Sequence, residues 1–194
     1  PVENVTRNEF VYHNGYYEGI EQEFRGFGVA DAVAHGDDSH PTSRARTWFL
    51  QGRRPNEVAT DRQAENIYEA PKGREYLTES FNDVGMYLSS AHAAMTVRRL
   101  AIGLDGRHIT YAYVHQTDTF QYPTEGFLPG GPTVPLTRFQ YEVPDGSGGH
   151  TVNHSVTEDV MVRAARFAWI RSDTSEVDNL GHVLMQHAFG RMLH

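Results

Sequence analysis

Alternation between apolar and polar positions is the main pattern of this chain, and it is clearest in the last third. Within 138–143, the apolar residues Phe139, Tyr141 and Val143 alternate with charged or amide side chains. A period of two residues is typical of a strand with one buried face. Two further segments alternate in the same way: 111–115 and 150–156. The pattern therefore predicts several half-buried strands.

Glycines mark turns and bulges near the start of the chain. Asn14-Gly15 lies between the aromatic and β-branched residues of 10–17 and predicts a hairpin turn. Gly19, Gly26 and Gly28 follow within a second strand-like stretch, where glycine indicates bulges or close approach of another backbone. The segment 44–52 again has strand-like aromatic residues. We therefore expect paired strands in this part.

Turn signals also divide the second half of the chain. Asp105-Gly106 and the glycine-rich stretch 145–149 predict turns, and 122–135 predicts an irregular connection because it is rich in proline and glycine. The segment from Asp178 to Gly181 lies between two strand-like flanks. It predicts a further hairpin.

One segment has a different period. Between 82 and 100, apolar residues recur every three or four positions, and Asn82 or Asp83 can cap the start. The residues with this spacing are Val84, Tyr87, Leu88, Ala91, Ala94, Met95 and Arg98. The pattern predicts one amphipathic helix near 82–100.

These elements indicate a mainly β fold, with antiparallel strands, hairpins and one helix. We expect 1–194 to be a single β-rich segment in three parts. The parts are an N-terminal hairpin sheet over 1–52, a loop and helix over 53–105, and a β-meander over 106–194.

Composition excludes several classes of protein. The chain has 17 basic and 25 acidic residues, and its net charge of -8 has the wrong sign for neutralising nucleic-acid phosphates. Cysteine is absent, which excludes a disulfide framework, a catalytic thiol and a cysteine zinc site. No apolar run approaches the ~18 residues of a membrane span, so we expect no membrane contact. The start at Pro1, without a targeting segment, suggests a piece of a longer polypeptide.

The candidate catalytic and metal-binding patterns are weak. His150 and His154 would lie roughly 13 Å apart on a strand, too far for one metal ion. The segment 21–23 has the Glu-x-Glu form of ADP-ribosyltransferases, but the strands that precede this motif in those enzymes have no room here. Solvated or ion-paired carboxylates are the simpler interpretation. We expect no catalytic residue, no metal and no cofactor.

Aromatic residues give a second functional hypothesis. Tyr12, Tyr16 and Tyr17 form a row that can stack on sugar rings, although cross-strand packing is the commoner explanation of such a row. A hydrolase or transferase would need converging polar groups with perturbed pKa values in a pocket. Both hypotheses stay open at this stage.

Four segments resemble one protein family in the same order. Residues 12–28 (YHNGYYEGIEQEFRGFG) are similar to Tyr-x-x-Gly-Tyr-Tyr-Asp-Gly-x-Glu-Arg-Glu-Phe-Arg-Gly-Phe-Gly, with Glu18 and Gln22 departing from it. This is a signature of the B component of Tc insecticidal toxin complexes and of SpvB-like, Rhs-associated proteins. The other segments are 46–52 (RTWFLQG), 100–106 (LAIGLDG) and 176–184 (EVDNLGHVL), with Gly190-Arg191 after it.

The resemblance implies a non-catalytic structural segment of a secreted bacterial virulence toxin. Such a segment would contribute to a larger β shell around a cytotoxic effector, or link the shell to a propeller. Its partners would be the rest of its own chain and other toxin-complex subunits. A secreted recognition module for a glycan or host protein is the alternative. The residues that carry the structural motif are Gly15, Tyr16, Tyr17, Gly19, Glu23, Phe24, Arg25, Gly26, Phe27, Gly28, Trp48, Asp178 and Gly181.

Arg25 has a structural role that the sequence itself suggests. It lies between Phe24 and Phe27, where we expect its guanidinium to be partly buried. A buried guanidinium needs a carboxylate or carbonyl partner, and Glu21, Glu23 or a backbone carbonyl can supply one.

Overall fold

The computed structural model describes residues 7–19, 21–37, 40–53, 66–178 and 182–192. These residues contain ten strands and no helix. The strands are β1 (Asn8–Glu18), β2 (Glu23–Ala34), β3 (Ser43–Phe49), β4 (Glu75–Phe81), β5 (Tyr87–Ile102), β6 (His108–Gln121), β7 (Thr133–Pro144), β8 (His150–Met161), β9 (Ala168–Val177) and β10 (Val183–Met192). The fold is therefore mainly β, as predicted.

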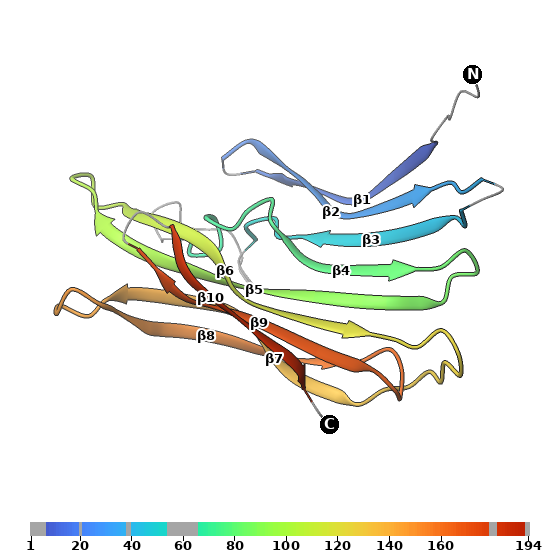
Figure 1. Ribbon diagram of the computed structural model, residues 1–194. Helices are drawn as coiled ribbons and strands as arrows, with labels where there is room; N and C mark the ends of the chain where they lie inside the picture. The colour runs from blue at the N-terminus through green and yellow to red at the C-terminus, as the bar shows by residue number, and fades with distance from the viewer. Residues whose placement is uncertain (1–6, 20, 38–39, 54–65, 179–181, 193–194) are drawn as a thin grey trace, which may run out of the picture.

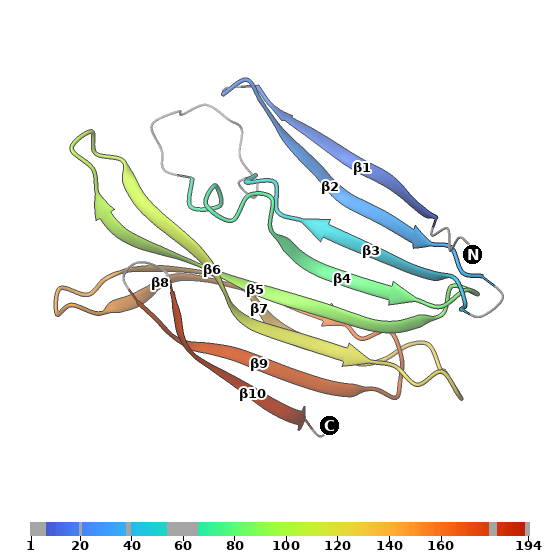
Figure 2. The same cartoon turned by 45° about the horizontal axis from the view of Figure 1, so that its top comes forward.

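All ten strands belong to one open sheet. The first six follow one another in antiparallel order, after which β9 pairs with β6 and β10 pairs with β9. β7 leaves this path, since it pairs in parallel with β5 and antiparallel with β8. In Figures 1 and 2, β1 to β5 form a curved layer, and the β7–β8 and β9–β10 hairpins overlap on the side of β5 that lies away from β1. β1, β8 and β10 each pair along one edge only within the described structure.

The sheet divides at a bulge in the middle of β5 and β6. Ala94 pairs with Gln116 and Met95 pairs with Val114, so His115 is an extra residue in β6. On one side of the bulge, β4 and β9 flank the β5–β6 pair. On the other side β7 flanks β5, and the outer edge of β6 has no strand partner among the described residues. The bulge therefore marks the branch point, in keeping with the tendency of bulges to end a pairing.

Two apolar clusters form the core, and both lie around the branch. The first lies where the β7–β8 hairpin covers the β6–β9 part of the sheet, and it consists of Phe120, Tyr122, Val134, Leu136, Val160, Val162, Ala164 and Trp169. The second consists of Met95, Val97, Ala112, Phe139 and Tyr141, with Ile67, Tyr68 and Ala70 packed against it. β1 to β4 contribute no residue to either list. β1 to β3 form a single layer, whereas Glu79 of β4 is buried beneath Arg163.

The helix predicted near 82–100 is wrong, because this segment forms β5. Ser90, His92 and Thr96 are buried, and their spacing follows the two-residue period of a strand. These side chains are polar, so the apolar pattern did not reveal that period. Met95 and Val97 are buried as well because elements pack on both faces of β5. The apparent helical spacing comes from this double burial.

The turn predicted at Asn14-Gly15 is also wrong. β1 continues through this pair, with Asn14 at φ +57°, and the chain reverses between Glu18 and Glu23 instead. The ladder slips by one residue between Gly15 and Tyr17, which places the extra residue in β2 beside Gly26 (φ +82°). Asparagine tolerates the left-handed region, so it fits within this irregular ladder. The predicted bulge in the second strand is confirmed.

The remaining expectations are mostly confirmed. β9 and β10 pair as the predicted hairpin, although residues 179–181 of the connection lie outside the described residues. The turn over 145–149 joins β7 to β8. Over 106–194 the strands do not form the simple meander that we expected, because β9 pairs with β6 and β7 pairs with β5. Within the described residues, no helix is long and apolar enough to cross a membrane.

Candidate functional site

Arg25 lies at the bulge of β2, and its side chain is only 3% exposed. Its guanidinium donates to Glu69, and Nη2 also donates to Glu21 Oε2 at 3.2 Å. Nη1 lies 3.4 Å from the Gly52 carbonyl oxygen, and Nε lies 3.8 Å from Glu23 Oε2. The predicted pairing with nearby glutamates or a backbone carbonyl is confirmed.

These contacts keep the guanidinium charged. Burial opposes the charge, but the hydrogen bond and charge of Glu69, followed by the charges of Glu21 and Glu23, raise the pKa of Arg25 above its ordinary value. Three carboxylates around one buried cation make an ion-paired cluster that stabilises the bulge.

A segment far along the chain completes this cluster. Lys72 Nζ lies 2.9 Å from Glu23 Oε2 and 2.7 Å from Glu69 Oε1. Its hydrogen bond lowers the pKa of Glu23. The sequence analysis did not find Glu69 or Lys72, because the segment 53–72 has no period and no turn motif that would place it over Arg25. The covering segment 66–73 therefore acts as a strap over the single layer.

The two N-terminal segments that resemble the toxin family meet at this cluster. Gly52 has φ +69°, and a Cβ there would lie 2.6 Å from Arg25 Nη1. Gln51 Nε2 donates to the carbonyl oxygens of Asn14 at 2.8 Å and of Gly26 at 3.1 Å. Residues 12–28 and 46–52 thus form one structural unit.

The aromatic motif residues form an exposed group on the β1–β2 hairpin. Tyr12 stacks on Phe27 with ring centroids 5.1 Å apart, and Phe24 meets Phe27 edge to face at 5.4 Å. A Cβ added at Gly15 would touch both phenylalanines, at 3.4–3.5 Å. The glycine therefore leaves room for the rings.

The other predicted residues do not join one site. Tyr16 packs under the Arg53 guanidinium at 4.5 Å, and Trp48 packs under Arg46 at 5.9 Å. Tyr17 is exposed, and Gly19 lies in the β1–β2 turn. At Gly28, an added Cβ would lie 3.2 Å from Gln51 Oε1. Asp178 lies after β9, and Gly181 lies outside the described residues.

A second polar cluster, which the sequence analysis missed, is centred on Asp118 of β6. Asp118 is 2% exposed, and its Oδ1 accepts hydrogen bonds from Trp169 Nε1 and Arg171 Nε, both at 2.7 Å. Nearby, Arg163 Nε donates to the buried Glu79 at 2.7 Å. The only sequence signal was the acidic residue in an otherwise strand-like run.

Two histidines next to this cluster are buried without charge. Burial, with a smaller contribution from Arg138, lowers the pKa of His92 to about 3. Burial also lowers the pKa of His115 to about 4. His115 Nδ1 lies 2.8 Å from Oγ1 of Thr96, and Thr96 is fully buried. Both rings are therefore neutral parts of the core at neutral pH.

Among the described residues, one group of carboxylates is close enough to share a metal ion: Glu21, Glu23 and Glu69. The Arg25 guanidinium and the Lys72 ammonium already neutralise this group. His150 and His154 lie on β8, and so the strand that we predicted for them is confirmed.

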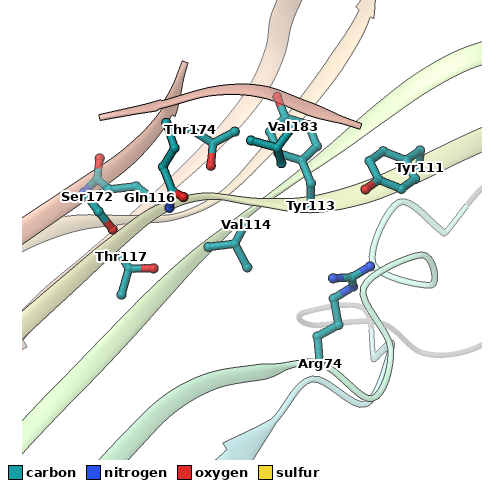
Figure 3. A pocket seen from close by; sticks show the side chains of 10 residues that line it. Arg74, Tyr111, Tyr113, Val114, Gln116, Thr117, Ser172, Thr174 and Val183 are labelled. Carbon is teal, nitrogen blue, oxygen red and sulfur yellow. The ribbon is translucent and has the colours of Figure 1, made fainter. Parts of the chain in front are cut away.

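A hollow of about 420 Å³ lies where β6 and β9 separate. Side chains from β6, from the β9–β10 hairpin and from the start of β4 surround it (Figure 3). Its lining residues include Arg74, Tyr111, Thr117, Ser172, Thr174 and Gln186. A second hollow of about 410 Å³ lies beside Tyr16, Trp48 and Gln51.

No protein-family model and no curated protein sequence matches the chain. Its fold matches the crystal structure of TcdB2-TccC3-TEV and a Tc holotoxin pore of Photorhabdus luminescens with a TccC3 mutation, each over 97% of this chain with a TM-score of 0.61 at 14% identity. A crystal structure of TcdB2-TccC3 matches with a TM-score of 0.59. The chain spans 9–10% of the length of these chains. The fold is thus that of a part of Tc toxin chains.

Proposed function

We propose that this chain is a non-catalytic structural segment of a toxin-complex B-type or Rhs-type protein. It contributes to a β shell that encloses a cytotoxic effector, or it links that shell to a propeller. The remainder of its own polypeptide and other toxin-complex subunits are its partners. The whole protein is secreted and acts outside the bacterium.

The open sheet is the observation that carries this proposal. β1, β8 and β10 each pair on one edge only within the described structure. Apolar side chains on all three are exposed, among them Phe10 (59%), Met161 (61%) and Leu184 (63%). Long apolar edges are aggregation sites unless other strands cover them, so such a sheet suits a segment whose neighbours belong to a larger wall. The fold match to part of much longer Tc toxin chains supports the same conclusion.

The buried charges also favour a structural role. Arg25 is paired with carboxylates, and Asp118 is paired with Trp169 and Arg171. Groups that are saturated in this way stabilise a fold and are poorly placed to exchange protons with a substrate.

Hydrogen exchange tests the proposal. The outward-facing amides of β1, β8 and β10 are expected to exchange quickly in the 194-residue chain and slowly in a longer polypeptide that carries it, because neighbouring strands then cover the edges. The amides of β5, which is flanked on both sides, serve as the control and exchange slowly in both. Equally fast exchange of all three edges in the longer polypeptide would contradict a shell segment.

A recognition module for a glycan or host protein is the second candidate. The polar hollow beside β6 favours it.

A further inference from the structure

We propose that the hollow between β6 and β9 binds a short glycan. This inference does not rest on the shell proposal, because it depends only on the side chains around the hollow. The sequence pointed to tyrosines of β1 for such a role, whereas the structure provides a better arranged group at the branch of the sheet.

The branch creates the hollow. Pairing of β6 with β9 ends at Gln116 and Asp173, next to the His115 bulge. Beyond this point, Arg98 Nη1 donates to the carbonyl oxygen of Val177 at 2.9 Å, which fixes the end of β9 at a distance from β6. The resulting volume, about 420 Å³, falls within the range of ~300–1,000 Å³ that is usual for ligand sites.

The lining offers uncommitted neutral hydrogen-bonding groups. Thr117, Ser172, Thr174 and Gln186 line the hollow, and none of their side chains has a hydrogen bond to another described residue. Hydroxyl and amide groups both donate and accept hydrogen bonds. Sugar hydroxyls require partners of this kind, whereas an apolar ligand would leave them unpaired.

Tyrosine rings supply the apolar surface that a sugar also needs. Tyr111 and Tyr113 are nearly parallel, with centroids 6.1 Å apart and planes at 15°. Tyr113 is buried and holds its place by bonding to Arg98, while Tyr111 is partly exposed at the hollow. The face of an exposed tyrosine suits the C–H groups of a pyranose ring.

Arg74 adds a preference for acidic sugars. Its side chain extends toward the hollow from the segment before β4 (Figure 3), and it has no ion pair with another described residue. No carboxylate lines the hollow. A uronate or other carboxylate-bearing sugar would therefore find a cation and no repelling charge.

The second hollow is less suited to a ligand because its polar groups are already engaged. The Gln51 amide bonds two backbone carbonyls, and the Arg53 guanidinium covers the Tyr16 ring. This hollow supplies the matched comparison for the experiment.

The experiment screens the 194-residue chain against an array of neutral and uronate-terminated oligosaccharides and measures the strongest binders by calorimetry. We expect Ser172→Ala and Thr174→Val each to weaken binding about tenfold, as for a lost hydrogen bond. Arg74→Gln should weaken binding of acidic glycans only. Thr157→Val, on the exposed side of β8, is the control and should leave binding unchanged. The melting temperature should not change in any of these variants.

Three results would overturn the proposal. They are no binding above background on the array, binding that the Ser172 and Thr174 variants leave intact, and binding that depends on Trp48 or Arg53 of the other hollow. Preference for extended peptides over every glycan, measured in a parallel peptide array, would also overturn it. None of these results bears on edge protection in the longer polypeptide.

Discussion

Charged groups are buried in two parts of this molecule by different means. In the Asp118 region, which comprises the β6–β9 pair and the β7–β8 hairpin, a second layer of strands covers the sheet. In the Arg25 region, which comprises β1 to β3 and the strap 66–73, the sheet is a single layer. There the cover consists of carboxylates and of the strap itself.

The difference teaches what a single-layer sheet needs to bury a charge. Asp118 lies among apolar side chains and depends on three donors, the side chains of Trp169, Arg171 and Gln116. Arg25 depends on three carboxylates that remain 37–62% exposed, so water can compensate when a partner is lost. Damage to the Asp118 region should therefore be the more severe.

The two tryptophans allow each region to be followed separately. Trp169 belongs to the Asp118 region, and Trp48 lies in β3 opposite Val29 in the Arg25 region. In Trp48→Phe the remaining tryptophan reports on the Asp118 region, and in Trp169→Phe it reports on the Arg25 region. Urea unfolding in these two backgrounds shows whether the regions unfold together.

The largest effect is expected from Asp118→Ala. The variant leaves the buried Trp169 Nε1, the partly buried Arg171 guanidinium and the Gln116 amide without their acceptor. The free energy of unfolding should fall by about 3–5 kcal/mol, measured by urea unfolding in the Trp48→Phe background. Asp118→Asn keeps an acceptor oxygen and should lose less. Equal losses in both variants would show that the hydrogen bonds do not matter.

Arg25→Ala should reduce stability by about 2–3 kcal/mol, because it leaves three carboxylates without their central cation. Trp48 fluorescence in the Trp169→Phe background measures the loss. Arg46→Ala is the control, since Arg46 pairs with Asp31 on an exposed surface and should cost less than about 1 kcal/mol. If the two variants lose the same stability, Arg25 is not the centre of its region.

Mild acid should weaken the Asp118 region first. His92 has a pKa lowered to about 3, so the unfolded chain binds more protons below its ordinary pKa of 6.5. Stability is therefore lost as the pH falls from 6.5, by about 2 kcal/mol at pH 5 from His92 and by a similar amount from His115, whose pKa is lowered to about 4. In the Arg25 region the lowered pKa values of Glu23 and Asp31 remove stability only as the pH falls below about 4.5.

Urea unfolding at several pH values checks this order. Between pH 6.5 and 5, the loss should be seen by Trp169 and be smaller in His92→Gln, which no longer titrates. A loss of the same size at Trp48 would show that the two regions unfold as one unit.

The smallest effect is expected from two glycine substitutions, which distinguish backbone strain at a positive φ from displacement of the Arg25 guanidinium. Gly52→Ala places a Cβ against Arg25 Nη1, whereas Gly73→Ala, at a similar positive φ, meets nothing within 4 Å. Both should lose about 1 kcal/mol through the unfavourable φ. Gly52→Ala should lose at least about 1 kcal/mol more, measured by urea unfolding with Trp48 fluorescence. Equal losses would mean that the guanidinium moves away freely.

Local patterns predicted much of the fold, while contacts distant in sequence escaped them. The strand class and the glycine bulge in β2 follow from short-range periods and from glycine's backbone freedom. The carboxylates at positions 21 and 23 were recognisable as partners of Arg25 because they are neighbours in the sequence. Glu69 lies 44 positions away, and nothing in the sequence fixes that loop closure.

Two of the errors, at β5 and at Asn14-Gly15, have related physical causes. In β5, buried polar residues such as Ser90 and Thr96 carry the strand period, so hydrophobicity alone suggests a helix. At Asn14-Gly15, residues typical of a tight turn occupy an irregular position inside a strand instead. Both cases require knowledge of which strands lie alongside, and this information is tertiary.

The branch at the His115 bulge has a consequence for how such pieces can be joined. An unbranched sheet has two edge strands, so further strands can extend it only at those two edges. The described sheet has three open sides, along β1, β8 and β10, because β5 exchanges one neighbour for another partway along its length. A segment of this kind can join three sheets. One sheet can divide into two at the branch, while the hydrogen-bond ladder along β5 continues through it.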